Sequence, residues 1–255
     1  MATTLSATRT DTDELLSRFN TYFEATPADS PRLIETAYAL RYQVYCLERN
    51  FEEAAQYENC LEQDEFDHRA LHSLVFHRPS AEAIGTVRVI PAGPMRDSMP
   101  IQKLLRQNDI DASRYFSTAE TAEISRFAIS KDFRRRNADQ TGRGTNYTPE
   151  IERRSNLPCL GLIQGILRHS LDMGVTTWAA VMEPQLIRML ACMGIRFTPI
   201  GPVVSHHGLR QPAFCDVPRM LKNLKIEKPD FWSVVTNAGE LFYPARSFAA
   251  QRCVA

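Results

Sequence analysis

The sequence has no net charge, no paired-cysteine motif and no long apolar run. Its 30 basic and 30 acidic residues balance over 255 positions, so overall charge gives no argument for a nucleic acid or an anionic membrane as partner. The six cysteines are scattered without a C-x-x-C pair, which argues against a zinc finger or a disulfide framework. No stretch approaches the roughly 20 continuous apolar residues of a membrane span, and acidic residues precede any apolar run at the N-terminus. We therefore expect a cytoplasmic protein with reduced thiols, no membrane span and no nucleic-acid partner.

What is present is the composition of an ordinary globular protein, with 44% apolar and 24% charged residues, which suffices for a large core. Hydrophobic spacing predicts the order helix, antiparallel strands, helix, strand, helix, strand, which differs from the regular alternation of a Rossmann fold. We therefore expect an α+β fold, with a mixed, mostly antiparallel central sheet flanked by helices. The expected helices span residues 13–25, 31–47, 95–108, 157–173 and 184–193, and the expected strands span residues 71–77, 84–91, 122–130, 175–182 and 195–204.

The pattern along the chain predicts three parts. Residues 1–30 are expected to be an N-terminal extension, residues 31–224 the folded domain, and residues 225–255 a C-terminal tail. Within the domain, residues 131–156 lose all periodicity and predict a long, basic, mobile loop. The tail mixes aromatic and polar residues, and the sequence leaves open whether it covers the domain or contacts a second copy.

Four short clusters place charged residues in or beside apolar elements. They contribute, in chain order, Arg41 with Tyr45, then Glu62, Asp64 and Asp67, then Arg88, and finally Glu123 and Arg126. A charged residue inside an apolar strand, as at Arg88 and Glu123, is less common than one on a helix surface. Structural ion pairs produce the same pattern, so each cluster taken alone is compatible with a structural role or a functional one.

Taken together and in this order, the clusters resemble the acyl-homoserine-lactone synthases, a branch of the GNAT fold that takes acyl chains from acyl carrier protein. That family has an arginine, then phenylalanine and tryptophan, then Glu-x-Asp-x-x-Asp, an arginine on a strand, and Glu-x-x-Arg on a later strand. The matching positions here are Arg41, Tyr45, Phe51, Glu62, Asp64, Asp67, Arg88, Glu123 and Arg126. Tyr45 and Phe51 depart from the family's aromatic residues, which weakens the expectation that S-adenosylmethionine is the acceptor.

A second resemblance covers most of the chain. The strings RYQVYCLERNFE, FDHRALHSLV, GTVRVIP, EISRFAISKDFRRR, MEPQLIRMLACMGIRFTPIGP and HHGLRQP are similar to acyltransferases associated with the PEP-CTERM/exosortase system. These acyltransferases are in turn similar to the N-acyl amino acid synthases. The resemblance implies a GNAT-like acyltransferase fold in a bacterial protein that moves a long-chain acyl group to an amino acid such as tyrosine. Acyl carrier protein would be the donor, with no further cofactor and no metal.

Amide formation suggests a role for each charged cluster. An amino acid arrives with a protonated amine, so a carboxylate must remove a proton before the amine attacks the thioester. We assign this step to Glu123, with Arg126 as a second catalytic residue; an ion pair between the two is the structural alternative. The acidic motif would draw in the ammonium and orient Arg41 or Arg88. A backbone N–H at a strand bulge would stabilise the oxyanion.

Two basic features are candidates for binding negative charge on the substrates. Arg210, in HHGLRQP, or Arg88 would hold the acceptor's carboxylate through a bidentate fork, and a surface arginine is the alternative for Arg210. Residues 131–154 carry seven basic and four acidic residues, and Arg134, Arg135 and Arg136 stand near their start. The string at 140–144 is one residue short of the coenzyme A loop pattern. We therefore interpret the basic stretch as a docking surface for the acidic acyl carrier protein, with a solvated loop as the alternative.

His68 and His72 are four residues apart, but they stand where a strand begins and have no third ligand, so no metal site is expected. Three functions remain. The preferred one is an N-acyl amino acid synthase. The second is an autoinducer synthase that acylates S-adenosylmethionine to give acyl-homoserine lactone, and the altered aromatic positions and the HHGLRQP string argue against it. The third is a non-catalytic regulator that binds acyl carrier protein, and the intact charged set argues against it.

Overall fold

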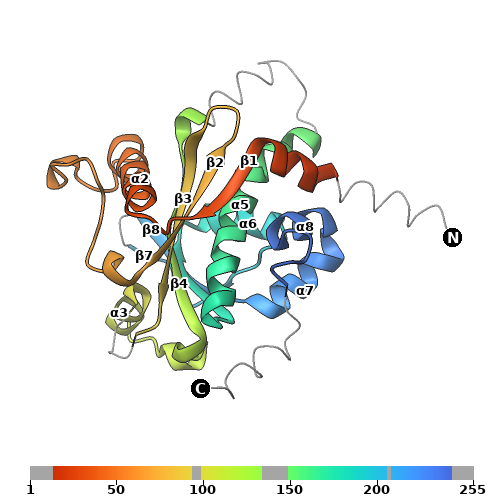
Figure 1. Ribbon diagram of the computed structural model, residues 1–255. Coiled ribbons are helices and arrows are strands. Elements are labelled where there is room, and N and C mark those ends of the chain that lie inside the picture. Colours follow the sequence, from red (N-terminus) through yellow and green to blue (C-terminus); the bar gives the residue numbers. More distant parts are fainter. Residues whose placement is uncertain (1–13, 94–98, 134–148, 206–207, 243–255) are drawn as a thin grey trace, which may run out of the picture. The chain divides into compact units, whose positions relative to one another are not determined.

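The computed structural model describes residues 14–93, 99–133, 149–205 and 208–242 (Figure 1). Contacts divide the chain into two compact units. The first unit comprises residues 1–16, 89–125 and 167–255, and the second comprises residues 17–88 and 126–166. The chain passes from one unit to the other within single strands and helices, so each unit contains part of strands β3 and β4 and part of helix α5.

The strands follow the hydrogen-bonded order β1-β2-β3-β4-β5-β8-β6, and β7 pairs with β8. The pairs β1–β2, β5–β8, β6–β8 and β7–β8 are antiparallel, whereas β4 and β5 are parallel. This is the mixed, mostly antiparallel sheet that the sequence predicts. The strands are β1 (Phe23–Pro27), β2 (Leu71–His77), β3 (Glu82–Pro91), β4 (Thr121–Ile129), β5 (Thr177–Met182), β6 (Thr198–Pro199), β7 (Val204–Ser205) and β8 (Leu209–Asp216).

In the second unit, helix α2 (Pro31–Arg41) packs on one face of β2. Ser30 caps the helix by accepting a hydrogen bond from the Leu33 amide, and Pro31 occupies the first turn, where its missing N–H costs nothing. The apolar side of α2 joins Leu74 of β2 in a buried cluster. The chain stays helical after Arg41, but residues Tyr42–Glu48 form a π-helix. The predicted helix over 31–47 is therefore confirmed in extent, with its last two turns widened.

The other face of β2 lies against helix α5 (Pro149–Met173). Side chains alternate along a strand, so Ser73 and Val75 point away from the face that carries Leu74. Gly161 and Gly165 of α5 meet these side chains, and a Cβ at Gly165 would lie 2.6 Å from the Ser73 Cβ. The two glycines, four residues apart on one side of the helix, allow this close approach. Helices α2 and α5 thus pack on opposite faces of β2 in the second unit.

The first unit is built around β5, whose Trp178 is fully buried and donates through Nε1 to the Ser170 hydroxyl of α5 at 2.8 Å. Gly174 and Gly194 end α5 and α6 with positive φ values of 66° and 85°, the conformation that favours glycine just after a helix. The helices of this unit are α3 (Pro100–Gln107), α6 (Pro184–Cys192), α7 (Val217–Glu227) and α8 (Pro229–Thr236). None of the helices in the described ranges is long and apolar enough to span a membrane.

Four predicted boundaries need correction. The first helix covers residues 14–22 and ends before the predicted residue 25, because residues from Phe23 onward form the edge strand β1. Helix α5 begins at Pro149, inside the segment 131–156 that was expected to be a loop. Residues 195–204 contain only the short strands β6 and β7, whereas the long strand β8 was missed. The expected start of the tail after residue 224 falls inside α7.

Candidate active site

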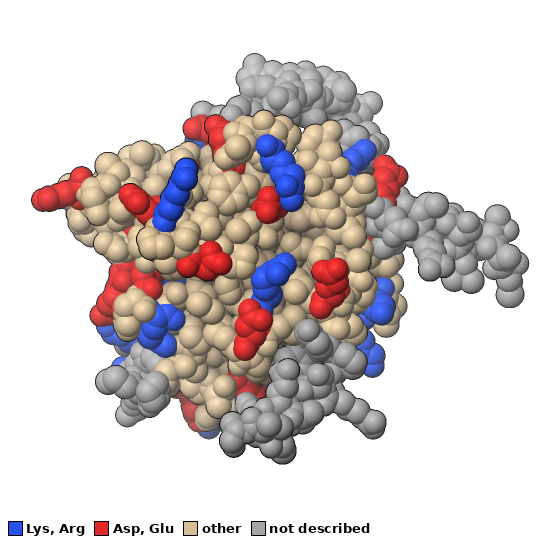
Figure 2. Space-filling view, viewed as in Figure 1, with Lys and Arg blue, Asp and Glu red and all other residues tan. Residues whose placement is uncertain are grey.

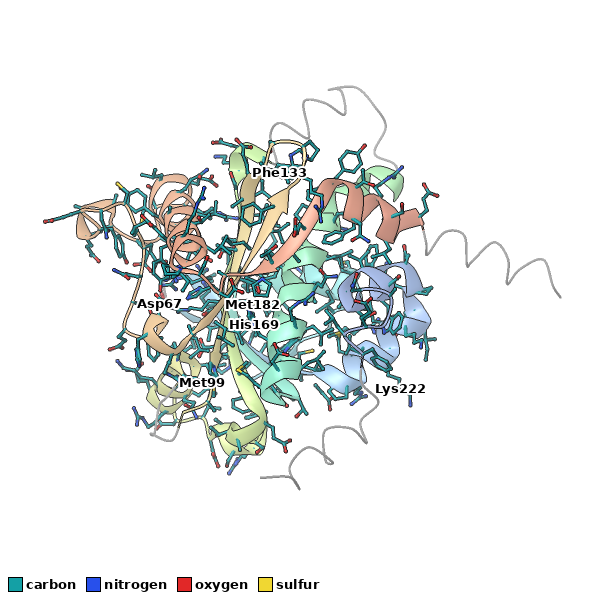
Figure 3. The ribbon with its side chains drawn as sticks, in the orientation of Figure 1. Asp67, Met99, Phe133, His169, Met182 and Lys222 are labelled. Carbon is teal, nitrogen blue, oxygen red and sulfur yellow. The ribbon has the colours of Figure 1, made fainter. Side chains whose placement is uncertain are left out.

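Six of the predicted residues form one ionic network in the second unit: Arg41, Glu62, Asp64, Asp67, Arg88 and Arg126. Arg41, the last residue of α2, is fully buried, and its Nε donates to Glu62 Oε2 at 2.5 Å. Its two terminal nitrogens donate to both carboxylate oxygens of Asp67, at 2.7 and 3.0 Å. Asp67 lies in the turn just before β2 (Figure 3). This bidentate pair ties the end of α2 to the start of the strand.

The other two arginines reach the same carboxylates from neighbouring strands. Arg88 of β3 donates through one nitrogen to Asp64 at 2.6 Å and to Asp67 at 3.0 Å. Arg126 of β4 donates to both oxygens of Glu62 and, at 3.3 Å, to Asp64. The acidic motif is therefore neutralised by arginines rather than forming an acidic wall, although its carboxylates do orient Arg41 and Arg88 as expected.

The network is closed on one side and open on the other. The side chains of Arg41 and Glu62 have no exposed surface, whereas those of Asp64 and Arg126 are 28% and 21% exposed. A buried ion network recovers little net stability after desolvation, but it fixes the geometry of its members. Arg126 is thus a rigidly held guanidinium that faces solvent at one edge.

Proton affinities in the network show how strongly the charges are coupled. Burial alone would raise the pKa of Asp67, but hydrogen bonds from Arg41 and the nearby charge of Arg88 hold that pKa well below its ordinary range. The pKa of Glu62 is likewise lowered, because Arg41 and Arg126 outweigh the effect of burial. Both carboxyls are therefore ionised at neutral pH.

This coupling predicts a loss of stability in acid. Both carboxyls bind protons less readily in the folded chain than in the unfolded chain, so their contribution is complete above about pH 5 and declines as the pH falls through about 4. We expect urea midpoints measured from pH 7 to pH 3 to fall steeply below pH 5. The variant Asp67→Asn should show a shallower fall. A wild-type midpoint that stays constant over this range would contradict the prediction.

Two predicted aromatic residues lie beside the open edge. Tyr45 is in the π-helix, and its ring packs against Phe51 at a centroid distance of 6.4 Å. The Arg126 guanidinium lies over the Tyr45 ring at 5.4 Å, a cation–π contact. Burial raises the pKa of the Tyr45 phenol, so the phenol is neutral and keeps its proton. π-Helical turns are rare and often occur at functional sites, and this one carries Tyr45 to the network.

The predicted catalytic pair stands on β4, where Arg126 adopts a left-handed conformation with a φ of 51°. A residue of this kind interrupts the two-residue alternation of a strand, and the strand bulge that we expected stays a prediction. The pairing of β4 with β5 extends from Thr121 to Ile124, opposite Ala180, and so stops just before this point.

Glu123 belongs to the first unit, where its side chain is 3% exposed. Its Oε2 accepts a hydrogen bond of 2.7 Å from the backbone N–H of Ile101 in the first turn of α3. Arg126 is held by Glu62 and Asp64 in the second unit. The ion pair considered as the structural alternative for Glu123 and Arg126 is therefore not needed to fix either side chain.

The remaining predicted residues lie elsewhere. Arg210, on β8 in the first unit, is mostly buried and forms an ion pair of 3.4 Å with Glu183. Its proposed role in binding a carboxylate stays a prediction. Arg134, Arg135 and Arg136 lie outside the described residues. On the face of the molecule drawn in Figure 2, basic and acidic side chains of the described residues are interspersed.

Two residues near the network were missed by the sequence analysis. His72, for which the sequence excluded only a metal site, is a buried histidine, with Nε2 3.4 Å from Asp67 Oδ1 and its ring against Tyr38. The signal available in the sequence was strand alternation, which puts His72 on the same face of β2 as Leu74, toward α2. Glu52, beside Phe51, lies 3.7 Å from Arg126. No group of three or more potential metal ligands occurs in the part of the chain that the structure describes.

Comparisons with known proteins agree with this architecture. Residues 40–141 match the family model described as an acetyltransferase (GNAT) domain. No curated protein matches the chain by sequence. Sixty chains of solved structures resemble it. All of the residues of the ionic network lie within the stretch that matches the family model.

The solved structures that resemble the chain include three synthases, LasI, BjaI and FeeM. The AHL synthase LasI is 18% identical with a TM-score of 0.52, over 76% of this chain and 89% of LasI. BjaI, a CoA-dependent acyl-homoserine lactone synthase solved with SAM and isopentyl-CoA, is 17% identical with a TM-score of 0.54, over 88% of this chain and 90% of BjaI. FeeM, an N-acyl amino acid synthase from uncultured soil microbes, is 16% identical with a TM-score of 0.51, over 79% of this chain and 94% of FeeM. At these identities the likeness shows that the chain has the GNAT fold. The association with an exosortase system stays a prediction.

Proposed function

We propose that this protein is an N-acyltransferase that joins a long-chain acyl group, carried as a thioester, to the amine of an amino acid. The observation that carries the proposal is the network of three arginines and three carboxylates. Its members come from four separate stretches of sequence and leave Arg126 at an open edge. The GNAT domain match and the synthases of similar fold support acyl transfer as the reaction class.

The open edge of the network suits an amino acid because it offers both signs of charge. Arg126 can bind a carboxylate through hydrogen bonds, and the partly exposed carboxylates beside it can accept from an ammonium. Tyr45 and Phe51 add a flat apolar surface beside these groups. S-adenosylmethionine also carries an α-amino acid group, so the same edge is compatible with the second candidate, an acyl-homoserine-lactone synthase like BjaI. The two aromatic positions that depart from that family favour the amino acid.

The chemistry that we propose has three requirements. Glu123 removes a proton from the acceptor's ammonium, directly or through water, and the neutral amine attacks the thioester carbonyl. The oxyanion of the tetrahedral intermediate accepts a hydrogen bond from a backbone N–H near the left-handed Arg126, where pairing with β5 has ended. Collapse of the intermediate breaks the C–S bond, and the departing thiolate takes up the proton that the attacking nitrogen loses, so the products are the amide and the carrier thiol. The acyl group arrives activated, so no covalent enzyme intermediate is needed.

We propose acyl carrier protein as the donor, on the basis of the basic stretch 131–154. Docking of an acidic carrier protein onto basic residues weakens as salt screens the charges. With acyl carrier protein as donor, kcat/KM should fall by about tenfold between 50 and 500 mM NaCl. The triple variant Arg134→Glu, Arg135→Glu, Arg136→Glu should produce a comparable loss at low salt. If neither change has an effect while acyl-coenzyme A supports equal rates, coenzyme A is the donor.

The function itself is tested by mass spectrometry of lipid extracts from cells that express the protein. New N-acyl amino acids in these cells, and none in cells that express Glu123→Gln, would establish the reaction, its acceptor and its acyl chain lengths. Acyl-homoserine lactones would replace the proposal with the second candidate. Folded protein that yields no new product in cells or with purified donors would overturn both.

A further inference from the structure

Glu52 differs from every other carboxylate at the network. Its side chain is four-fifths buried, and its partner is Arg126, whose nearest nitrogen is 3.7 Å away, beyond hydrogen-bond distance. No side chain or backbone group in the described ranges donates a hydrogen bond to its carboxylate. Glu62, Asp64 and Asp67, by contrast, each accept hydrogen bonds from arginine. A mostly buried carboxylate without a donor is costly, which indicates that it serves a purpose other than stability.

Glu52 also leaves the cluster with an unbalanced charge. The three guanidiniums are neutralised by Glu62, Asp64 and Asp67, so Glu52 is a fourth carboxylate that adds one negative charge at the open edge. Its exposed fraction of 19% is close to that of Arg126, so both groups can be reached from solvent on the same side of the network. The edge therefore presents one cation and one surplus anion side by side.

Besides the charged network, two groups close to Glu52 are neutral, the Cys46 thiol and the Tyr57 phenol. Burial, with a smaller contribution from the charges of Glu62 and Glu52, raises the pKa of the Cys46 thiol to about 11 and that of the Tyr57 phenol to about 12. Neither group carries charge at neutral pH. Tyr57 also lines an open surface hollow of about 530 Å³, together with Ala55, Gln56, Glu58, Asn59, Leu61 and Gln63.

From this we infer that Glu52 binds the ammonium group of the acceptor, while Arg126 beside it binds the acceptor's carboxylate. The inference rests on the proposed function and names the residue that selects an amine-bearing acceptor. The ammonium supplies the donor that Glu52 lacks and cancels its surplus charge. The two groups hold an α-amino acid by its ammonium and carboxylate, which leaves its side chain directed to the neighbouring aromatic residues Tyr45 and Phe51.

Calorimetry with three probes tests this assignment: L-tyrosine, tyramine and 3-(4-hydroxyphenyl)propanoate, which lacks the amine. The wild type should bind L-tyrosine about 10- to 100-fold more tightly than the propanoate, as expected for loss of one charge-assisted hydrogen bond. In Glu52→Gln this preference should disappear, and tyramine binding should weaken by the same factor. The matched control is Glu53→Gln, which changes the adjacent exposed carboxylate and should keep the preference.

Stability and turnover separate this role from a structural one. Glu52→Gln removes a poorly paired charge, so its melting temperature should equal or exceed that of the wild type. A clear drop in melting temperature with an unchanged preference for L-tyrosine over the propanoate would overturn the assignment. N-acyl amino acids formed by both proteins with equal KM for the acceptor would overturn Glu52 while leaving the proposed function standing. If Glu52→Gln loses the binding preference but the wild type forms no product, Glu52 stands as the ammonium site and the proposed function is overturned.

Discussion

Replacing Arg41 with methionine is expected to lower the free energy of unfolding by about 3–5 kcal/mol, because the change leaves two buried carboxylates without their main partner. Arg41 has no exposed surface, and it donates to Glu62 and to both oxygens of Asp67. Methionine has a similar length and fills most of the same space, so packing changes little. For a chain of this size the loss corresponds to a fall of roughly 10 °C in melting temperature.

The matched control for Arg41 is Arg196, which forms a two-point ion pair with Glu227 at 2.9 and 2.6 Å on the surface of the first unit. Both side chains are about half exposed. Exposed pairs of this kind contribute about 0–1 kcal/mol. Arg196→Met should therefore leave urea and thermal midpoints almost unchanged. Equal effects of the two substitutions would show that burial of the network adds nothing to stability.

The fold was largely predictable where local signals were strong. Ser30-Pro31 at a helix start, the alternation of β2 to β4, and glycines at the ends of α5 and α6 all act within a few residues. β1 and β8 were missed because their own sequences are weak strand formers. β8 carries Pro212 between buried residues, opposite Val181 of β5. Such strands exist because their neighbours supply hydrogen-bonding partners, and a local sequence pattern does not reveal those neighbours.

Membership of the network was predictable, but its pairing was not. The order of the charged clusters along the chain named all six residues. Sequence proximity paired Glu123 with Arg126, whereas the structure pairs Arg126 with Glu62, 64 residues away. The left-handed backbone at Arg126 has no sequence signal, since such conformations are ordinarily found at glycine or asparagine. The burial of Glu52 had no sequence signal either. Glu52 is one of several acidic residues in a loop, and its neighbours Glu53 and Glu58 are exposed.

The largest effect on activity is expected at Glu123. Changing it to glutamine should lower the rate of acyl transfer by about 10²- to 10⁴-fold, the usual contribution of a general base. The substitution keeps the fold, because the glutamine carbonyl can still accept the hydrogen bond from the Ile101 N–H at the start of α3. The control is Glu120→Gln, three residues before Glu123. The Glu120 carboxylate accepts a hydrogen bond from the Thr176 hydroxyl, and its change should leave the rate of acyl transfer unaltered.

The pH dependence of the Glu123 variant distinguishes a base from a structural carboxylate. The base is needed only while the acceptor's amine is protonated, so the defect of Glu123→Gln should shrink as the pH rises past the pKa of that amine. A structural defect would stay constant over the same range, because the hydrogen bond to Ile101 does not depend on the acceptor. Single-turnover rates with purified acyl carrier protein, from pH 7 to pH 10, measure the difference. Full turnover by the variant at pH 7 would show that Glu123 is not the base. The next candidate would then be Asp64, the carboxylate of the network with the most exposed side chain.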